Sequence, residues 1–588
     1  MDLRGANGRR PLRKGGRNNM AYKRLGDLLI AAGVISEEDL ARGLQLQKGT
    51  KDRLGTVLIK NNIISEMQLI EALQMQLGLE FIDLTKVSIP TEMAQALPKN
   101  IATQYQIVPI RLVKDELFLA MSDPLNFYAI EEAKRATRRR IHPVVATAAG
   151  IEHSILVLYS NEGAAKAIEE MKREAAASGD TASNALDYAF ASNQLGDDVN
   201  SAPTIRLVNS MLERAITERA SDIHLEPRET EMVVRMRIDG VMHKIMNVPR
   251  DVQASVISRV KIMAGMDISE RRIPQDGRFN VRVKEKDIDM RVSTLPTVYG
   301  EKIVMRLLDK SGGRVTKEAV GLTGSDLEKY DEMLKLRNGV LLLVGPTGSG
   351  KTTTMYAMIN QLNTEEVNMV TLEDPVEYNV DGINQVQINE KVGLTFASGL
   401  RSILRQDPDI IAVGEIRDGE TADIAKRSAI TGHIVLSTLH TNDAVGTIDR
   451  LHDIGCEPYL IATALKGVIS QRLVRRICPD CREAYKPDAD ELREFGLPDD
   501  ADETFYRGTG CAKCYNRGYR GRVAVFEMLP IDRKVRDLIY QQAGRVAIET
   551  ELKRPETGFV SMQQNALRLV REGVTSVDEV RRVIHEDN

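Results

Sequence analysis

The chain has 588 residues, too many for one hydrophobic core, which predicts about 3 to 5 domains. Its 42% hydrophobic and 28% charged residues exclude a largely disordered protein, and a net charge of only −4 gives no support to a nucleic-acid binder. No apolar run approaches the ~18 to 20 residues of a membrane-spanning helix, and the N-terminus lacks a secretory signal, so a cytoplasmic protein is expected.

Residues 1–23 form a basic, glycine-containing tail with almost no acidic residues. We expect this tail to be disordered and solvated, and a weak contact with a membrane surface is the alternative.

Residues 24–47 and 53–76 are two copies of one pattern, each opening with Arg-Leu-Gly and closing with Leu-x-x-Gln. Ser36 and Ser65 are expected to cap helices that carry leucines at helical spacing. Each copy is therefore predicted to form two short helices. Asn62 stands where the first copy has Gly33, and asparagine is the residue after glycine that best tolerates a left-handed backbone.

The next segments predict a mixed domain, a linker and a second domain. Strand and helix patterns continue to residue 160, and residues 161–201 read as a linker containing one short charged helix. Residues 202–309 begin with a helix and continue with strands. In one of them, 233–238, apolar and basic side chains alternate, as in a strand with one face buried. A polar hinge at 310–316 precedes a C-terminal domain that spans 318–588.

Four apolar strands are expected in the C-terminal domain, separated by helical stretches of ten or more residues. Such alternation predicts a parallel α/β sheet. The predicted strands are 340–344, 367–372, 409–413 and 434–438.

The sequence GPTGSGKT at 345–352 fits the phosphate-binding loop G-x-x-x-x-G-K-[ST], directly after the first strand and before a helix. Backbone N–H groups would converge on the phosphates, Lys351 would neutralise them, and Thr352 would reach Mg²⁺. We therefore predict an ATP and Mg²⁺ site. Its expected nucleotide-binding residues are Gly345, Pro346, Thr347, Gly348, Ser349, Gly350, Lys351, Thr352 and Thr353.

Acidic residues follow the next two strands: Glu373, Asp374 and Glu377 after one, and Glu415 after the other. The carboxyl ends of parallel strands are where such sheets bind ligands, so these acids are candidates for catalysis. An acid at a solvated strand end is the alternative for each of them. The aspartate that usually precedes the acid at Glu415 is missing, so Mg²⁺ would be held by Thr352, phosphate oxygens and water.

Two histidines flank the fourth strand. His440 at its end is placed to sense the γ-phosphate, whereas His433 precedes the strand. A structural role is the alternative for either one.

Two Cys-x-x-Cys pairs, Cys478 with Cys481 and Cys511 with Cys514, predict a structural Cys₄ zinc site within residues 474–522. Residues 488–495 between the pairs would form an inserted helix. The remaining cysteine, Cys456, is expected to be a small core residue.

These motifs resemble those of the secretion and type IV pilus ATPases from about residue 24 onward. The shared sequences are GPTGSGKTTT, LEDPVE, RQDPDIIAVGEIRD and TGHIVLSTLHTNDA, with further matches in ASDIHLEP, RIPQDGR, RVST and GEKIVMRLLD. The resemblance implies a multidomain α/β fold, with a RecA-like P-loop core preceded by an α+β, PAS-like domain and a mainly helical N-terminal repeat domain.

The resemblance also implies roles for individual residues. Glu377 would orient the attacking water as general base, Glu415 would be the Walker B acid, and His433 and His440 would form a sensor box. Arg291 and Arg306 would be carried to the nucleotide by the preceding domain, so that positive charge reaches the phosphates when the domains close.

The N-terminal repeat resembles a cyclic di-GMP-binding domain found on some of these ATPases, and this places that domain at residues 24–160. A helical module without a ligand is the alternative. The expected ligand residues are Arg24, Leu25, Gly26, Gln47, Arg53, Leu54, Gly55 and Gln76.

The resemblance therefore predicts a homohexameric motor for type IV pilus extension, attached peripherally to the inner membrane. Its partners would be a membrane platform protein and cytoplasmic pilus assembly proteins, and no nucleic acid polymer. A type II secretion ATPase is the near alternative, and a nucleotide-gated binding platform with slow turnover is a more distant one. A DNA-translocating motor is disfavoured because the chain has no Trp and no basic stripe interleaved with aromatics.

Overall fold

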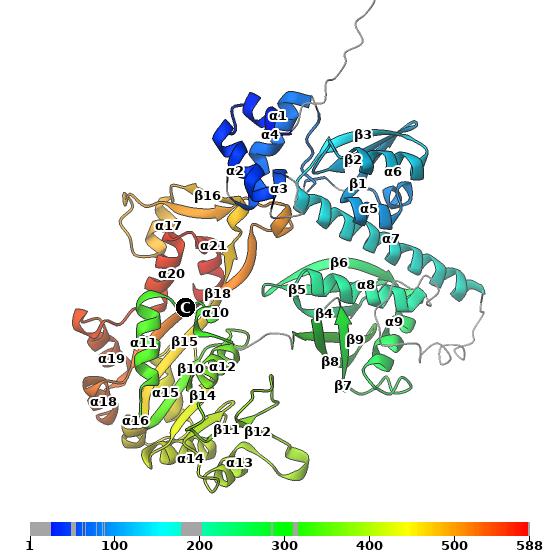
Figure 1. Cartoon of the computed structure of the whole chain (residues 1–588). Coiled ribbons are helices and arrows are strands. Elements are labelled where there is room, and N and C mark those ends of the chain that lie inside the picture. The colour runs from blue at the N-terminus through cyan, green and yellow to red at the C-terminus, as the bar shows by residue number, and fades with distance from the viewer. Residues whose placement is uncertain are drawn as a thin grey trace, which may run out of the picture. The chain divides into compact units, whose positions relative to one another are not determined.

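The computed structural model places the described residues in two compact units that divide between Tyr159 and Ser160 (Figure 1). Some predicted features lie outside the described residues: the tail at 1–23, the second part of the linker at 178–202, and Arg24, Arg53, Asn62 and Ser65 of the repeat. Within the described part of the chain, no helix is both long and apolar enough to cross a membrane. The described residues are 25–48, 54–61, 63–64, 66–77, 79–84, 86–87, 89–177, 203–283, 286–309 and 315–585.

The repeat forms four helices, two for each copy. Ser36 begins α2 with a capping box, because its hydroxyl accepts the Asp39 N–H at 3.1 Å while its own N–H donates to the Asp39 carboxylate. A small apolar core, including Leu29, Ile35 and Leu58, joins the copies. The helices are α1 (Leu25–Ala31), α2 (Glu37–Gln47), α3 (Leu54–Lys60) and α4 (Glu66–Leu77).

The rest of the first unit is an α/β structure around a three-stranded sheet. Its strands β1 and β2 are antiparallel, and β3 pairs with β2 in parallel. Its elements are α5 (Lys99–Tyr105), β1 (Ile107–Val113), β2 (Glu116–Met121), α6 (Phe127–Thr137), β3 (Arg140–Val145) and α7 (Ala148–Ala177).

Helix α7 corrects the predicted linker, because it continues through residue 160 to Ala177. Ile151 and Leu158 belong to the core of the first unit, whereas Ala167 and Met171 pack into a core of the second. The sequence predicted only one short charged helix in this segment, because this half of α7 buries alanines, which give a weak apolar pattern although alanine is the best helix former.

The first part of the second unit is a six-stranded antiparallel sheet in the order β6-β5-β4-β9-β8-β7. Side chains such as Val234, Met290 and Met305 face an apolar core, and the alternate residues of each strand form a polar face. Its elements are α8 (Pro203–Thr217), β4 (Ala220–Pro227), β5 (Glu231–Ile238), β6 (Val241–Pro249), α9 (Arg250–Met263), β7 (Gln275–Val283), β8 (Lys286–Thr297) and β9 (Gly300–Asp309).

The C-terminal part contains a seven-stranded sheet in the order β12-β11-β13-β14-β10-β15-β18, of which only β18 is antiparallel to its neighbour. Along β10, Leu342 and Val344 face one apolar core while Leu341 and Leu343 face another. This burial on both faces explains the unbroken apolar run. The strands are β10 (Gly339–Val344), β11 (Met369–Glu373), β12 (Asn384–Gln387), β13 (Ile410–Val413), β14 (Ile434–Leu439), β15 (Leu465–Ile477) and β18 (Tyr519–Pro530).

Helices cover this sheet and complete the domain. They are α11 (Gly324–Leu334), α12 (Lys351–Leu362), α13 (Phe396–Ile403), α14 (Gly419–Ile430), α15 (Gly446–Asp453), α16 (Pro458–Ala464), α18 (Arg533–Tyr540), α19 (Gly544–Leu552), α20 (Met562–Arg571) and α21 (Val577–Val580).

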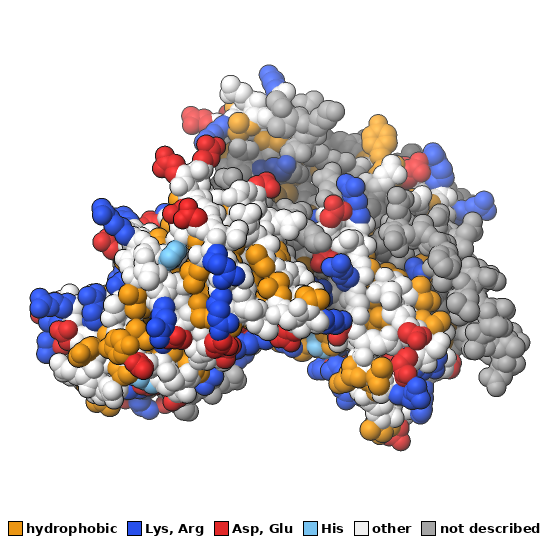
Figure 2. Space-filling model, turned by 90° about the horizontal axis from the view of Figure 1, so that it is seen from below, with side chains coloured by type: hydrophobic (Ala, Val, Ile, Leu, Met, Phe, Trp, Pro, Cys, Tyr) orange, Lys and Arg blue, Asp and Glu red, His pale blue; other side chains and the backbone are white. Residues whose placement is uncertain are grey.

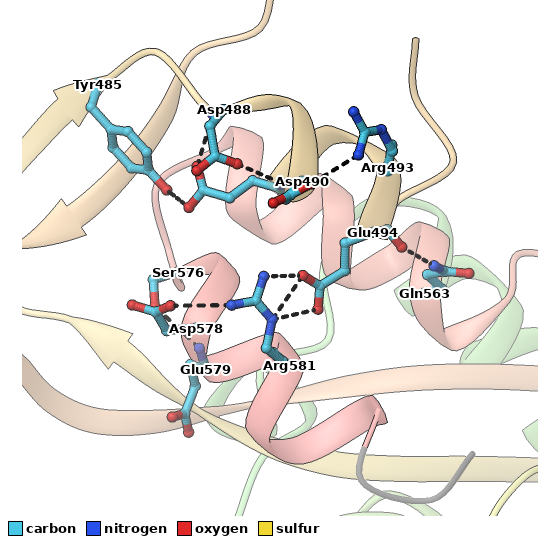
Figure 3. Close-up of polar contacts among 11 residues, drawn as sticks. Tyr485, Asp488, Asp490, Arg493, Glu494, Gln563, Ser576, Asp578, Glu579 and Arg581 are labelled. Carbon is cyan, nitrogen blue, oxygen red and sulfur yellow. Dashed lines mark hydrogen bonds and ion pairs between the residues drawn. The ribbon is translucent and has the colours of Figure 1, made fainter. Parts of the chain in front are cut away.

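A small cysteine-containing element lies between β15 and β18. It holds strands β16 (Arg482–Tyr485) and β17 (Phe505–Gly508) and the predicted inserted helix, α17 (Ala489–Glu494). Figure 3 shows Glu494 of α17 held by two C-terminal residues: its carbonyl accepts from Gln563 at 2.5 Å and its carboxylate pairs with Arg581 at 2.6 Å. The C-terminal helices thus fix this element against the domain.

On the face shown in Figure 2, acidic and basic side chains are interspersed and the hydrophobic ones form small separate groups. This mixture agrees with the small net charge of the chain.

Candidate active site

The predicted phosphate-binding loop joins β10 to α12. Gly348 and Gly350 have φ of +81° and +89°, which side-chain-bearing residues rarely adopt. Lys351 is 8% exposed, and its ammonium group donates to the carbonyls of Gly345 at 2.7 Å and Pro346 at 3.1 Å. Burial lowers the pKa of Lys351 to about 8, while the Glu415 carboxylate acts in the opposite direction. The cation is therefore held over the loop by carbonyl groups that a phosphate could replace.

A cavity of about 420 Å³ lies at this loop, at the carboxyl edge of the sheet. It brings together most of the predicted site residues from four separate segments. Those lining it are Thr347, Gly348, Ser349, Gly350, Lys351, Thr352, Thr353, Glu373, Asp374, Glu377, Glu415 and His440.

Glu373 is an anchor for the segment that carries Glu377. It is 3% exposed, and its carboxylate accepts hydrogen bonds from Tyr356 at 2.5 Å and Thr371 at 2.6 Å. The Tyr356 oxygen in turn accepts the Glu377 backbone N–H at 3.3 Å. Because these contacts occupy Glu373, the geometry favours Glu377 as the carboxylate that meets a substrate.

Glu377 forms an ion pair with Arg291 of β8 at 2.8 Å, and both side chains are about 30% exposed. Both residues line a second cavity of about 990 Å³, which Arg306 also lines. Arg306 is paired with Asp222 of β4 at 3.0 Å. Neither arginine lines the cavity at the phosphate loop, so the predicted contact with the nucleotide requires Arg291 to leave Glu377.

The two histidines do not share a site. His440 lies in the phosphate cavity with its Nε2 3.7 Å from Glu415, whose carboxylate also pairs with Arg417. Partial burial, and next the charge of Lys351, lower the pKa of His440, which favours a neutral imidazole. His433 precedes β14 and bonds the Ser428 carbonyl at 2.8 Å. The length of β14 places His433 at the opposite edge of the sheet from His440, so His433 does not line the phosphate cavity.

The four paired cysteines form one cluster, in which all sulfur atoms lie within 4.8 Å of one another. Separations of 3.7, 3.8 and 3.9 Å match the roughly 3.8 Å edge of a tetrahedron with Zn–S bonds of about 2.3 Å. The Cys514 sulfur also accepts the backbone N–H of Gly518 at 3.3 Å, a contact that stabilises a thiolate. The cluster therefore fits zinc, and Cys456 is separate from it in the apolar core.

Several residues at the site were not identified from the sequence, among them Met355 and Phe396, which line the phosphate cavity. Leu473 and Arg522 line the phosphate cavity, and Gln471 lies behind the loop. The available signal for Gln471 was the polar triplet Ser470-Gln471-Arg472, which lies between apolar residues of β15 and is almost fully buried.

Comparison with known proteins adds two family matches. The model for the family described as type II/IV secretion system protein matches residues 197–582, and the MshEN domain model matches residues 77–165. The second match begins directly after the repeat.

Three relatives illustrate the first match. The type IV pilus assembly ATPase PilB of Myxococcus xanthus is 41% identical, over 95% of this chain and 98% of its own. The type II secretion system protein E of Pseudomonas aeruginosa is 42% identical, over 86% of this chain and 99% of its own. The protein of the same name from Dickeya dadantii is 48% identical, over 67% of this chain and 78% of its own.

The cysteine cluster predicts about one zinc ion per purified chain. Cys478→Ser should lower the thermal stability of the C-terminal region while changing nucleotide affinity little, because the metal holds the fold and does not touch the phosphate cavity. Metal analysis and a nucleotide titration of the same samples check this. Protein purified without chelators that contains no zinc would contradict the assignment.

Proposed function

The chain belongs to the type II/IV secretion system protein family, whose members are motor ATPases, and we propose that its ATP hydrolysis drives type IV pilus extension. The observation that carries the proposal is the convergence of Lys351, Glu377, Glu415 and His440 on one sheet edge. The Myxococcus pilus ATPase supports the pilus role, because it aligns over nearly the whole chain. We place the protein as a homohexamer in the cytoplasm, bound peripherally to the inner membrane through a platform protein and cytoplasmic pilus assembly proteins.

A type II secretion ATPase is the second candidate. The Pseudomonas relative is equally similar in identity, but it aligns over a smaller share of this chain. Both functions use the same ATPase chemistry, so the steps below hold for either.

In the proposed mechanism, separate residues bind the phosphates, hold the metal ion and activate water. Lys351 moves from the loop carbonyls to the phosphates, and Thr352 would hold Mg²⁺, which would neutralise phosphate charge. Glu377 orients water and takes its proton as the water oxygen bonds to the γ-phosphorus and the bond to ADP breaks. The Arg291 guanidinium contacts the Glu377 carboxylate at 2.8 Å, so that oxygen can meet the attacking water only when Arg291 leaves it.

We also propose cyclic di-GMP as a ligand of the repeat, and the MshEN match that follows it supports this. The described ligand candidates lie on α1 to α4. Packing explains the glycines without a ligand: a Cβ at Gly26 would lie 2.6 Å from Leu40, and one at Gly55 would lie 3.2 Å from Leu69. The proposal therefore rests on the arginines and glutamines that recur in both copies.

Glu377→Gln should keep ATP bound but nearly abolish turnover, because only water activation is removed. Lys351→Ala should reduce both binding and turnover. Phosphate release and a nucleotide titration on both variants check this. Turnover at the wild-type rate by Glu377→Gln, with normal binding, would remove Glu377 as the base.

Turnover per chain should rise with protein concentration as rings form. Mixing inactive Arg291→Ala chains with inactive Lys351→Ala chains should restore no activity, because Arg291 lies against Glu377 of its own chain. Recovered activity would show that the arginine serves a neighbouring subunit. A demonstrated monomer with full, concentration-independent turnover would refute the ring.

The full chain should bind cyclic di-GMP in calorimetry, and Lys351→Ala should leave that binding unchanged. Arg24→Ala and Arg53→Ala should each weaken it by about 1 to 3 kcal/mol, as expected for charge-assisted hydrogen bonds. If saturating ligand gives neither heat nor thermal stabilisation, the repeat is a docking module for a partner protein.

A further inference from the structure

We infer that Gln471 is a positioning residue that sets the conformation of the phosphate-binding loop. This inference rests on the proposed role of the loop and adds a residue from a strand that no motif marks. Gln471 lies on β15, which pairs in parallel with β10, the strand that leads into the loop.

The Gln471 side chain bridges the loop and the helix that follows it. Its Nε2 donates to the Ser349 carbonyl at 2.8 Å, and its Oε1 accepts from the Thr354 hydroxyl at 2.7 Å. Gln471 is 1% exposed and Thr354 is fully buried, so water cannot replace either bond. One amide group therefore joins the last turn of the loop to the first turn of α12.

The bond to Ser349 determines where the next N–H points. In a planar trans peptide the C=O and N–H groups point in opposite directions. Because Gln471 holds the Ser349 carbonyl on the sheet side, the Gly350 N–H is directed away from β15. Gly350 lines the phosphate cavity, so Gln471 aims one of the backbone donors that bind phosphate.

Strand β15 also lies so close to the loop that only glycine fits at Gly345 and Gly350. A Cβ at Gly350 would lie 2.7 Å from the Gln471 Nε2, and one at Gly345 would lie 2.5 Å from the Gln471 carbonyl oxygen. Two glycines of the motif thus accommodate Gln471 in addition to the phosphates.

Three single variants separate positioning from stability. Gln471→Glu keeps the shape and the acceptor for Thr354 but sets an oxygen against the Ser349 carbonyl, and Gln471→Met removes both bonds. Thr354→Val removes only the bond on the helix side. Ser470→Ala is the matched control, because Ser470 is a fully buried neighbour on β15 whose hydroxyl has no hydrogen-bond partner in the described structure.

The full chain of each variant is titrated with Mg²⁺ and a non-hydrolysable ATP analogue, and its Tm is measured without nucleotide. Gln471→Glu and Gln471→Met should raise Kd by about 10-fold or more, as expected when a buried hydrogen bond is broken. Thr354→Val should lower Tm to a similar extent but raise Kd much less, and Ser470→Ala should leave Kd unchanged.

Wild-type Kd in folded Gln471→Met, with a lowered Tm, would overturn the inference and leave Gln471 as a core residue. Lys351→Ala tests the premise separately in the same titration. If that variant also binds with the wild-type Kd, the proposed nucleotide site itself is wrong. If only Lys351→Ala weakens binding, the nucleotide site is supported and the proposed role of Gln471 is wrong.

Discussion

The parallel pairing of the central strands is the constraint on which the site depends. Because β10, β11, β13 and β14 run in one direction, the residues that follow them gather at one edge of the sheet. Helices bury both faces of β10, so the loop that follows it starts from a fixed position. The pairing of the strands is therefore enough to bring the residues of the site together from distant parts of the sequence.

The ion pair between Arg291 and Glu377 connects this edge to the preceding sheet domain. Arg291 lines the cavity that it shares with Glu377 but not the cavity at the phosphate loop, so in the proposed mechanism its guanidinium moves to reach a phosphate. ATP binding would then free the base by attracting the arginine, and hydrolysis would be coupled to movement of the domain. A motor requires such a link, because domain motion must follow the state of the nucleotide.

Features coded by local spacing were predictable from the sequence, and contacts between distant segments were not. The phosphate loop, the apolar strands and the cysteine pairs each follow a short pattern, and the predicted helix in the cysteine element is present as α17. Gln471 and Ser349 are 122 residues apart, so no local pattern joins them. His433 and His440 belong to one sequence motif, but the strand between them carries them to opposite edges of the sheet.

The most direct test of the account is a structure of the assembled protein with Mg²⁺ and a non-hydrolysable ATP analogue. The account predicts the β- and γ-phosphates at Lys351, a water between the γ-phosphate and Glu377, and Arg291 moved from Glu377 to a phosphate oxygen. Phosphates bound away from Lys351, or an Arg291–Glu377 ion pair that persists beside the bound γ-phosphate, would contradict it.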